Sequence, residues 1–267
     1  MSLRQQVEQH LATQPQLVTD HLTRFTILGF ELGWLEPVTV EFLLTHSPAF
    51  SRQARGVVLL ANTGEEAARI LTDAALAMKT AGLIRGWRNE LYTVLAPNAD
   101  GTPDLSRPLF QLERGAFRRF GMLSLAVHIN GWRQDQHLWI GQRAASKAVD
   151  PGRLDNLAAG GMSAGEDATS CAIRELWEEA GVPAALASQV VAAGQLRSTR
   201  NETDGTHDEI LYCFDLQLPQ DFIPHNTDGE VAGFIATSVP ETVSRLAELT
   251  WDAALVTADF LLRKNWV

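Results

Sequence analysis

Three glutamates in the second half of the chain have a spacing that suits metal binding. Glu175, Glu178 and Glu179 occupy positions i, i+3 and i+4, and residues so spaced project from one face of an α-helix with Cβ atoms about 5–6 Å apart. Like charges this close oppose the helix by roughly 0.2–0.5 kcal/mol per pair, and a bound divalent cation would compensate them. Oxygen ligands favour Mg²⁺ or Mn²⁺ over zinc. The alternative is a solvated acidic face that binds nothing.

A glycine-rich loop precedes these carboxylates. Gly160, Gly161 and Gly165 let the main chain approach an ion or a phosphate closely, so a carbonyl such as that of Gly160 can join the metal shell. Arg174 follows Glu166 by eight residues, close to two helical turns. This spacing predicts an ion pair that ties the start of the helix to its middle.

These residues together resemble a known signature. Gly160, five residues, Glu166, seven residues and then Arg174 to Val182 (RELWEEAGV) are similar to the Nudix box. The resemblance to the Nudix hydrolase superfamily implies an α/β/α sandwich with a mixed sheet. It also implies hydrolysis of a diphosphate linked to another moiety.

The resemblance assigns roles within the box. It implies that the Mg²⁺ (or Mn²⁺) cofactor is held by Glu175, Glu178, Glu179 and Gly160. The structural positions of the box are Glu166, Arg174 and Gly181. Divalent ions neutralise a diphosphate and position the attacking water.

The general base stays open among Glu178, Glu179 and Glu230. Glu230 follows the turn Thr227-Asp228-Gly229 and leads into an expected strand. Similar enzymes often place a further acidic residue late in the domain, facing the helix ligands. An ordinary turn carboxylate is the alternative for Glu230.

Two segments outside the box indicate a branch of the superfamily. Residues 147–161 and 86–94 (GWRNELYTV) resemble the branch associated with thiamine pyrophosphokinase, in which an N-terminal domain of uncharacterised function precedes the Nudix domain. The resemblance implies thiamine diphosphate, or its oxidised or damaged analogues, as the substrate. A nucleotide-type Nudix hydrolase, acting on ADP-ribose, a dinucleotide or a nucleotide sugar, is the alternative. A non-catalytic ligand-binding regulator with the Nudix fold is a third.

Several further side chains are candidates for substrate contacts. Arg143 and Lys147 follow an expected strand and are candidates for phosphate binding, with simple surface solvation as the alternative. For Arg88, an interdomain ion pair and a substrate contact both fit. We expect Trp177 to pack against the N-terminal domain. The three histidines without metal-ligand spacing are interpreted as structural or exposed: His128, His207 and His225.

The elements that position these residues follow from periodicity and turn residues. In the first half we expect a strand over 56–61, a helix over 65–81 with Thr63 as N-cap, and a strand over 87–95. In the second half, Asn130-Gly131 predicts a hairpin between strands 122–129 and 137–141, and a loop follows over 146–165. Helices are expected over 166–180 and 253–264, and strands over 190–196, 209–218 and 230–236.

These elements indicate two domains. The Pro-, Gly- and Asn-containing segment 96–104 is predicted to be a turn or linker. We place a small α+β domain at 1–110 and the Nudix domain at 111–267, an α/β (α+β) class overall. The second part holds 13 basic and 21 acidic residues, against 9 and 11 in the first, so most of the net negative charge belongs to it.

Composition excludes several classes of partner. The net charge of −10 opposes binding to a nucleic-acid backbone, and no membrane-spanning apolar run or secretory leader is found. Two cysteines are too few for a disulfide framework. We expect a cytoplasmic protein whose partner is a small-molecule diphosphate, and a homodimer is an open alternative for its assembly.

Overall fold

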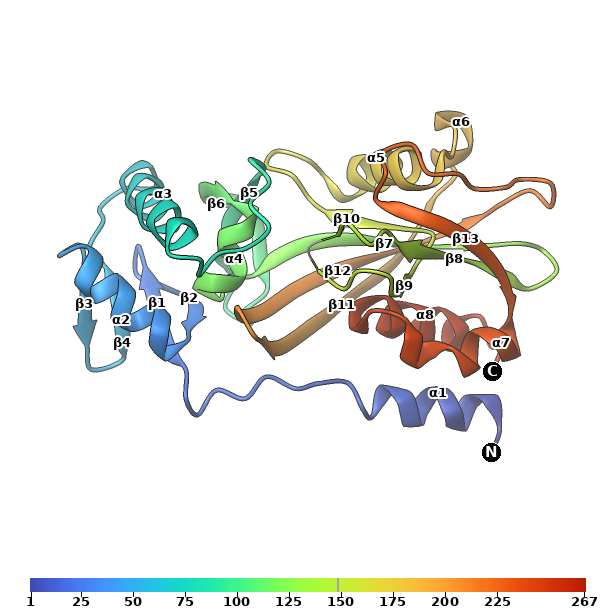
Figure 1. Cartoon of the computed structure of the whole chain (residues 1–267), viewed down its shortest axis with the longest axis horizontal. Helices are drawn as coiled ribbons and strands as arrows, with labels where there is room; N and C mark the ends of the chain where they lie inside the picture. Colours follow the sequence, from blue (N-terminus) through green and yellow to red (C-terminus); the bar gives the residue numbers. More distant parts are fainter. Residues whose placement is uncertain (148) are drawn as a thin grey trace.

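Two sheets, bridged by a hairpin, organise the chain (Figure 1). This computed structural model describes residues 1–147 and 149–267. A four-stranded sheet of order β2-β1-β4-β3 lies at one end, and a seven-stranded sheet lies at the other. Within the described residues, none of the helices combines the length and hydrophobicity that crossing a membrane requires.

The smaller sheet and its helices form an α+β unit. Its elements are β1 (Thr23–Ile27), β2 (Phe30–Leu35), α2 (Pro37–His46), β3 (Phe50–Gln53), β4 (Gly56–Leu59) and α3 (Gly64–Thr80). The strand predicted over 56–61 and the helix predicted over 65–81 are confirmed as β4 and α3. Thr63 is the N-cap of α3, and its hydroxyl accepts the amide of Glu66 at 3.2 Å.

The larger sheet is mixed. Its strands are β7 (Ser124–Trp132), β8 (His137–Arg143), β9 (Leu154–Asp155), β10 (Ala158–Gly161), β11 (Val191–Glu202), β12 (Gly205–Gln217) and β13 (Val231–Ser238). β12 and β7 run parallel, whereas the other neighbouring pairs are antiparallel.

Helices cover both faces of this sheet. They are α5 (Ala168–Ala180), α6 (Ala184–Ala187), α7 (Val239–Ser244), the short 3₁₀ helix η1 (Leu246–Glu248) and α8 (Trp251–Arg263). Val127 and Ile129 of β7 face the core under α5, while Ala126 packs with Val256 of α8 on the opposite face. This alternation confirms the predicted α/β/α sandwich.

The predicted linker is the turn of a hairpin. β5 (Leu91–Pro97) and β6 (Pro103–Glu113) pair antiparallel, and the amide of Asn98 donates to the carbonyl of Thr102 at 2.7 Å across the turn. α4 (Arg114–Phe120) follows β6 directly. The boundary proposed at residue 110 stays a prediction, and it falls inside β6 rather than in a flexible segment.

The predicted Asn130-Gly131 turn is wrong. Both residues lie inside β7, and the chain reverses at Arg133–Gln136, where Gln136 has φ of 60°. A Cβ at Gly131 would collide with the Leu157 side chain, so this glycine serves close packing rather than a turn. The loop predicted over 146–165 also contains the short strands β9 and β10, and it includes residue 148, which lies outside the described residues.

The N-terminal helix packs away from the N-terminal sheet. α1 (Leu3–Leu11) lies beside α7 and α8 in Figure 1, and Val7 is fully buried with Leu138 and Phe260 in their core. An extended segment then runs back to β1, and Asn201 exchanges two hydrogen bonds with the main chain of Val18, at 2.8 and 3.0 Å. The first residues of the predicted domain 1–110 therefore complete the core of the other half.

Tyr92 of β5 fixes the hairpin against the glycine loop. A Cβ placed on Gly161 would coincide with the Tyr92 hydroxyl, and Tyr92 itself is buried against Phe117 of α4. Because the phenol ring is rigid and enclosed, it has little room to move aside. The two halves therefore meet in contact with the chain that leads into the Nudix box.

We predict that Gly161→Ala destabilises the protein by about 1–3 kcal/mol, the usual effect of overpacking. Urea unfolding would measure the change. Gly233→Ala is the matched control, because a Cβ there meets no atom within 4 Å and its φ is not in the left-handed region. Equal stabilities of the two variants would contradict the packing described for Tyr92.

Candidate active site

The sequence around α5 defines both ends of the acidic helix. Asp167 is the N-cap, and its carboxylate accepts the amides of Thr169 and Ser170 at 2.9 and 3.0 Å. Gly181 ends the helix in the left-handed conformation, with φ of 62°. A Cβ at this position would also collide with the ring of His225. The predicted helix and its glycine stop are confirmed, with the start shifted by two residues.

Arg174 joins three carboxylates. Its guanidinium donates two hydrogen bonds to Glu166, at 2.8 and 2.9 Å, which confirms the predicted ion pair. Nη1 also donates to Glu175 at 2.7 Å and to Glu178 at 2.9 Å. Glu166 in turn accepts the amide of Ser163 at 3.1 Å, so the loop and the helix are held in one network.

Glu175 and Glu179 are buried beside the glycine strand. Glu179 accepts the amide of Ala159 at 2.9 Å, and a Cβ at Gly160 would overlap the Glu175 carboxylate. Only glycine at position 160 allows the main chain and this carboxylate to lie so close. The structure thus brings together the predicted ligands Gly160, Glu175 and Glu179, and Glu178 reaches the same network through Arg174.

The electrostatics of this donor set fit a divalent cation. Burial, reinforced by the neighbouring Glu175, raises the pKa of Glu179 to about 8. Burial is also the main cause that raises the pKa of Glu175, with Glu178 adding to it and Arg174 opposing it. Buried carboxylates that repel one another gain most from a multivalent cation, and their oxygens are hard ligands. The residues present therefore suit Mg²⁺ or Mn²⁺.

Glu230 faces this cluster from the start of β13. It forms ion pairs with Lys147 and, at 3.2 Å, with Arg88 of the N-terminal half. Burial alone would raise the pKa of Glu230, but Lys147 and Arg88 hold it below its ordinary value. Lys147 also lies 3.7 Å from Glu179. Three of the predicted site residues, Arg88, Lys147 and Glu230, are therefore neighbours.

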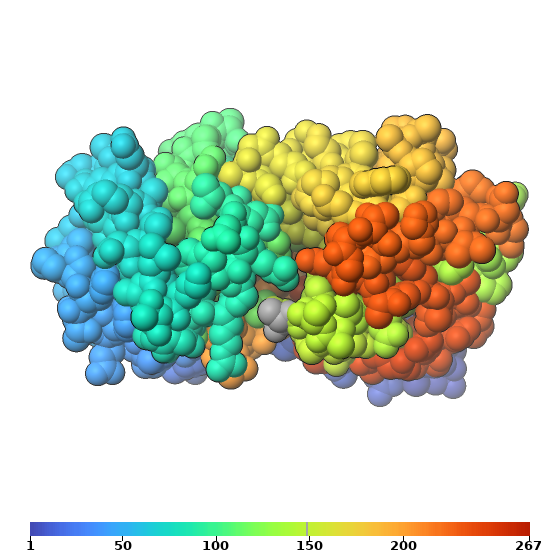
Figure 2. Space-filling view, turned by 45° about the horizontal axis from the view of Figure 1, so that its top comes forward, coloured from blue at the N-terminus to red at the C-terminus, as the bar shows by residue number. Residues whose placement is uncertain are grey.

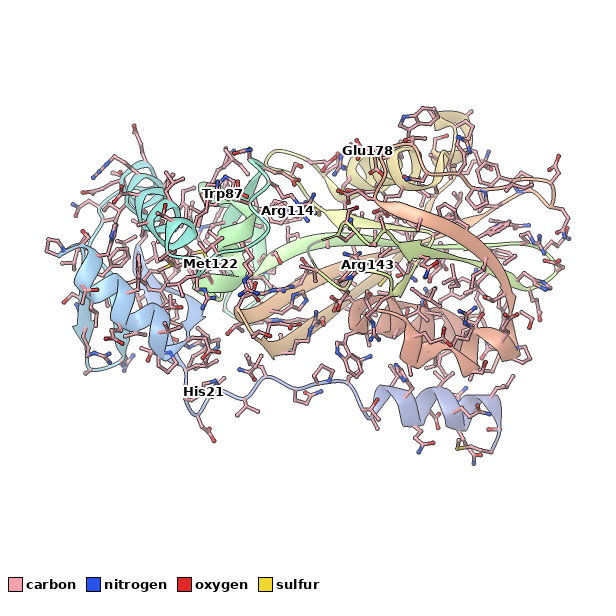
Figure 3. The ribbon with its side chains drawn as sticks, in the orientation of Figure 1. His21, Trp87, Arg114, Met122, Arg143 and Glu178 are labelled. Carbon is pink, nitrogen blue, oxygen red and sulfur yellow. The ribbon has the colours of Figure 1, made fainter. Side chains whose placement is uncertain are left out.

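The Arg143 side chain binds the segment that follows its own strand. Its guanidinium pairs with Asp155 at 2.8 Å and donates to the carbonyls of Val149 and Asp150 at 2.9–3.2 Å. The side chain still lines the pocket described next. Figure 3 shows where it lies relative to Arg114 of α4 and Glu178 of α5.

A pocket of about 230 Å³ opens between the two halves of the chain. Figure 2 shows the teal residues of the first part of the chain meeting the yellow and orange residues of the second part along a seam. The pocket wall includes Gly160 and Gly161 of the box and Ser124 and Ala126 of β7. The segment before β5 and the helix α4 contribute a group of cations, of which the sequence predicted only Arg88 as a site residue: Arg85, Arg88, Arg114 and Arg118.

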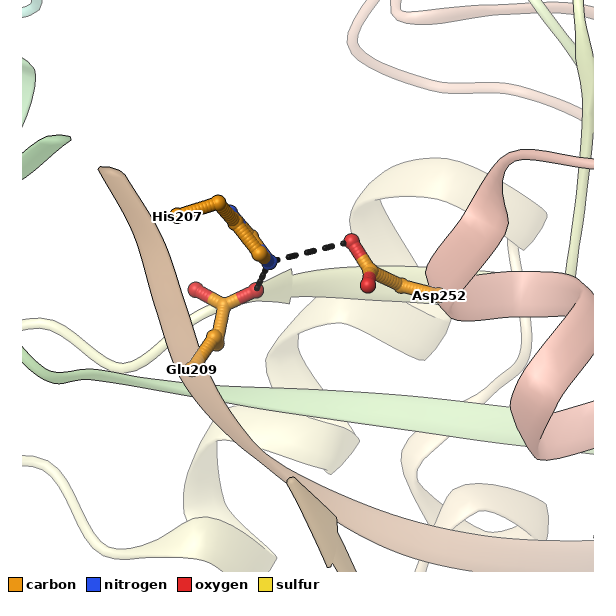
Figure 4. Close-up of side chains that lie close together, drawn as sticks. All are labelled: His207, Glu209 and Asp252. Atoms are coloured by element: carbon orange, nitrogen blue, oxygen red, sulfur yellow. Dashed lines mark ion pairs between the residues drawn. The ribbon is translucent and has the colours of Figure 1, made fainter. Parts of the chain in front are cut away.

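A second titratable group, distinct from the box, lines the same pocket. His207 and Glu209 of β12 meet Asp252 of α8 (Figure 4). The expectation that His207 is structural or exposed is incomplete, since it is buried in a wall of the pocket. His128 is buried and bonded to Asn156 at 2.8 Å, and His225 is exposed. The sequence could not predict that His207 and Asp252 lie together, because they belong to elements far apart in the chain and no periodic pattern relates them.

Trp177 does not pack against the N-terminal domain. Its side chain is 53% exposed on α5, so that expectation is wrong. The reason is helical geometry, because the buried face of α5 carries Cys171, Ala172, Leu176 and Ala180 and position 177 points away from it.

We predict that Arg174→Lys lowers the free energy of unfolding by about 1–2 kcal/mol in the absence of divalent ions. An ammonium cannot reproduce the two-pronged contact with Glu166. Urea denaturation in chelator would measure it. Arg197→Lys is the matched control, because this half-exposed arginine pairs two-pronged with Asp208 at 2.8 Å and is expected to change stability by less than about 0.5 kcal/mol. Similar losses in both variants would argue against a special role for Arg174.

Both parts of the chain match known protein families. Residues 122–260 match the NUDIX domain family, and residues 3–124 match a domain of unknown function, DUF4743. The chain is 35% identical to Nudix hydrolase 20, chloroplastic, of Arabidopsis thaliana, over 78% of this chain and 56% of that protein. It is 34% identical to Nudix hydrolase 24, chloroplastic, of the same plant, over 76% of this chain and 56% of that protein.

The chain thus spans little more than half the length of these relatives. A crystal structure of DR0079 from Deinococcus radiodurans superposes with a TM-score of 0.50 over 64% of this chain and 99% of that chain, at 20% identity, which shows a shared fold. The Nudix match covers 139 of the 267 residues. The box carboxylates lie on one helix, and the family match spans more than half of the sequence. The chain therefore belongs to the Nudix family.

Proposed function

We propose that the protein is a divalent-metal-dependent pyrophosphohydrolase that cleaves thiamine diphosphate, or an oxidised or damaged analogue of it, to the monophosphate. The observation that carries the hydrolase assignment is the convergence of three box carboxylates and the Gly160 main chain beside a pocket lined with cations. A diphosphate needs both features, because its charge must be neutralised before water can attack.

The ligands proposed for Mg²⁺ or Mn²⁺ are Glu175, Glu178, Glu179 and the carbonyl of Gly160. When bound, the ion supplies charge neutralisation and a lower pKa for the attacking water. Arg174 orients Glu175 and Glu178 through hydrogen bonds of 2.7 and 2.9 Å, while the amide of Ala159 holds Glu179. The protein thereby presents carboxylate oxygens that are already fixed in place.

The phosphate groups of the substrate need cationic partners. Lys147 and Arg88 line the pocket and share Glu230 as their counter-ion. A diphosphate entering the pocket would take over part of this pairing, which suits a site that exchanges anions. Glu178, Glu179 and Glu230 remain the candidates for the general base.

Two properties of the pocket support the thiamine assignment beside the branch resemblance. The rings of Tyr92 and Phe117 contribute to its wall, and the carboxylate of Glu209 lies on the wall that β12 forms. A thiazolium is positively charged and is attracted by aromatic faces and by negative charge, with a cation–π contribution of roughly 0.5–2 kcal/mol.

A substrate panel tests the assignment. Monophosphate and phosphate release would be measured with Mg²⁺ and with Mn²⁺ for thiamine diphosphate, oxidised thiamine diphosphates, ADP-ribose, NADH, nucleotide sugars and nucleoside triphosphates. We expect the highest kcat/KM for a thiamine compound. Dominant cleavage of ADP-ribose or NADH would instead establish a nucleotide-type hydrolase. Binding without hydrolysis of any compound would establish the regulator.

We predict that Glu178→Gln lowers kcat by about 100-fold or more and weakens the binding of Mg²⁺. The variant removes a ligand charge and a candidate base, and either role carries an effect of this size. Steady-state kinetics and calorimetric titration of Mg²⁺ would measure it. Glu248→Gln is the control, because Glu248 is half exposed and pairs with Arg245 outside the pocket. Unchanged hydrolysis in Glu178→Gln would disprove the assignment of this site.

We predict that Glu230→Gln raises KM more than it lowers kcat. Its ion pairs place it as the counter-ion of Lys147 and Arg88, so an amide would leave both cations less firmly positioned. Michaelis–Menten analysis at saturating Mg²⁺ would separate the two effects. A fall in kcat of about 100-fold with unchanged KM would identify Glu230 as the general base instead.

A further inference from the structure

The pocket has a polar wall that the diphosphate chemistry leaves unused. His207 and Glu209 are two residues apart on β12 and face the same side of the strand, and Asp252 enters from the first turn of α8 (Figure 4). His207 Nε2 lies 3.4 Å from an oxygen of Asp252 and 3.8 Å from an oxygen of Glu209. The His207 side chain is only 8% exposed, and within the described residues Nε2 has no hydrogen-bond partner.

The neighbouring arginine decides where the imidazole carries its proton. Arg118 Nη2 lies 3.4 Å from His207 Nδ1. A guanidinium only donates hydrogen bonds, so Nδ1 is the acceptor and the proton of the neutral ring is on Nε2. This tautomer turns a buried N–H donor toward the two carboxylates.

Arg118 and Arg200 together disfavour a metal ion at this wall. A protonated Nε2 cannot ligate, and the Asp252 carboxylate already accepts two hydrogen bonds from Arg200, at 2.8 and 3.2 Å. The wall therefore holds an anion whose charge is already balanced by a guanidinium.

Glu209 supplies a second acceptor next to the imidazole. One of its oxygens accepts the hydroxyl of Ser124 at 2.7 Å, which fixes the carboxylate, and the other faces His207. The wall therefore offers a donor, His207 Nε2–H, and an acceptor, the carboxylate of Glu209, side by side. An unpaired buried donor of this kind is costly unless a ligand satisfies it.

We propose that His207 and Glu209 bind the organic moiety of the substrate through a heterocycle edge that presents a hydrogen-bond acceptor beside a donor. Two ring chemistries have such an edge: a ring nitrogen beside an exocyclic amine, and a lactam. Arg118 and Ser124 are positioning residues: Arg118 orients the imidazole through Nδ1, and Ser124 orients the carboxylate of Glu209. The proposal rests on the proposed function, because it places the diphosphate at the Gly160 end of the same pocket.

The experiment compares substrates with and without the ring edge. Kinetics with Mg²⁺ would be measured for thiamine diphosphate, which has the amino edge, for its 4-oxo-pyrimidine analogue, which has the lactam edge, and for butyl diphosphate, which has neither. Butyl diphosphate would be measured as a substrate and as a competitive inhibitor. The variants are Glu209→Gln and His207→Gln, with Asp208→Asn as the matched control.

Asp208 is a suitable control because it lies between the two residues on β12, points to the other side of the strand and pairs with Arg197. We expect Glu209→Gln and His207→Gln to lower kcat/KM for at least one ring compound by about 10- to 100-fold, the effect of losing a hydrogen bond to a charged group. The kcat/KM or Ki of butyl diphosphate should change by less than about 3-fold. Asp208→Asn should behave as the wild type.

The outcomes separate the two claims. If the wild type hydrolyses none of the diphosphates, the proposed function fails. If the wild type is active and the variants lose the same factor for every compound, or lose nothing, the ring-binding role is overturned. Glu209 is partly accessible and does not fill a core position, so Glu209→Gln decides the question even if His207→Gln fails to fold. A change of preference between the amino and the oxo compound would identify the edge that is recognised.

Discussion

One guanidinium holds the acidic end of α5 together. Arg174 contacts Glu166, Glu175 and Glu178 within 2.9 Å, and no other cation in the described chain pairs with these three carboxylates. Without Arg174, the helix would carry uncompensated like charges on one face, including the buried carboxylate of Glu175, and this would oppose folding. The proposed metal binding and hydrolysis depend on this arrangement, because it holds the ligand carboxylates of Glu175 and Glu178 in fixed positions.

The second half of the chain does not form the pocket alone. The hairpin β5–β6 and α4 supply Tyr92, Arg114 and Arg118 to its wall, and Arg88 reaches across to Glu230. Ser163 of the glycine loop donates to Glu90 at 2.7 Å, and Glu90 pairs with Arg114. The family scaffold thus provides the carboxylates, while residues from the DUF4743 match enclose the space beside them. Selection among diphosphates is a role that this enclosure is well placed to serve.

Short-range patterns in the sequence were enough to predict the local structure of the Nudix box. The glycine stop, the acid spacing and the ion pair of Arg174 with Glu166 are all short-range features, and each is found where it was expected. The turn predicted at Asn130-Gly131 was wrong because tertiary packing overrides the turn propensity of these residues. Gly131 lies against the Leu157 side chain, where a Cβ would not fit. His207 and Asp252 lie on different elements, and only the fold of β12 against α8 brings them together. The exposure of Trp177 likewise depends on which helix face is already occupied.

The path of the N-terminal segment has a consequence for synthesis. Val7 is buried in a core made by α7 and α8, whose residues are translated long after it. The apolar side of α1 therefore stays uncovered until these two helices have been translated. Its contacts have a very large sequence separation, which places them among the slow steps of folding. A nascent chain that stalls before α8 would leave the apolar side of α1 exposed to other proteins.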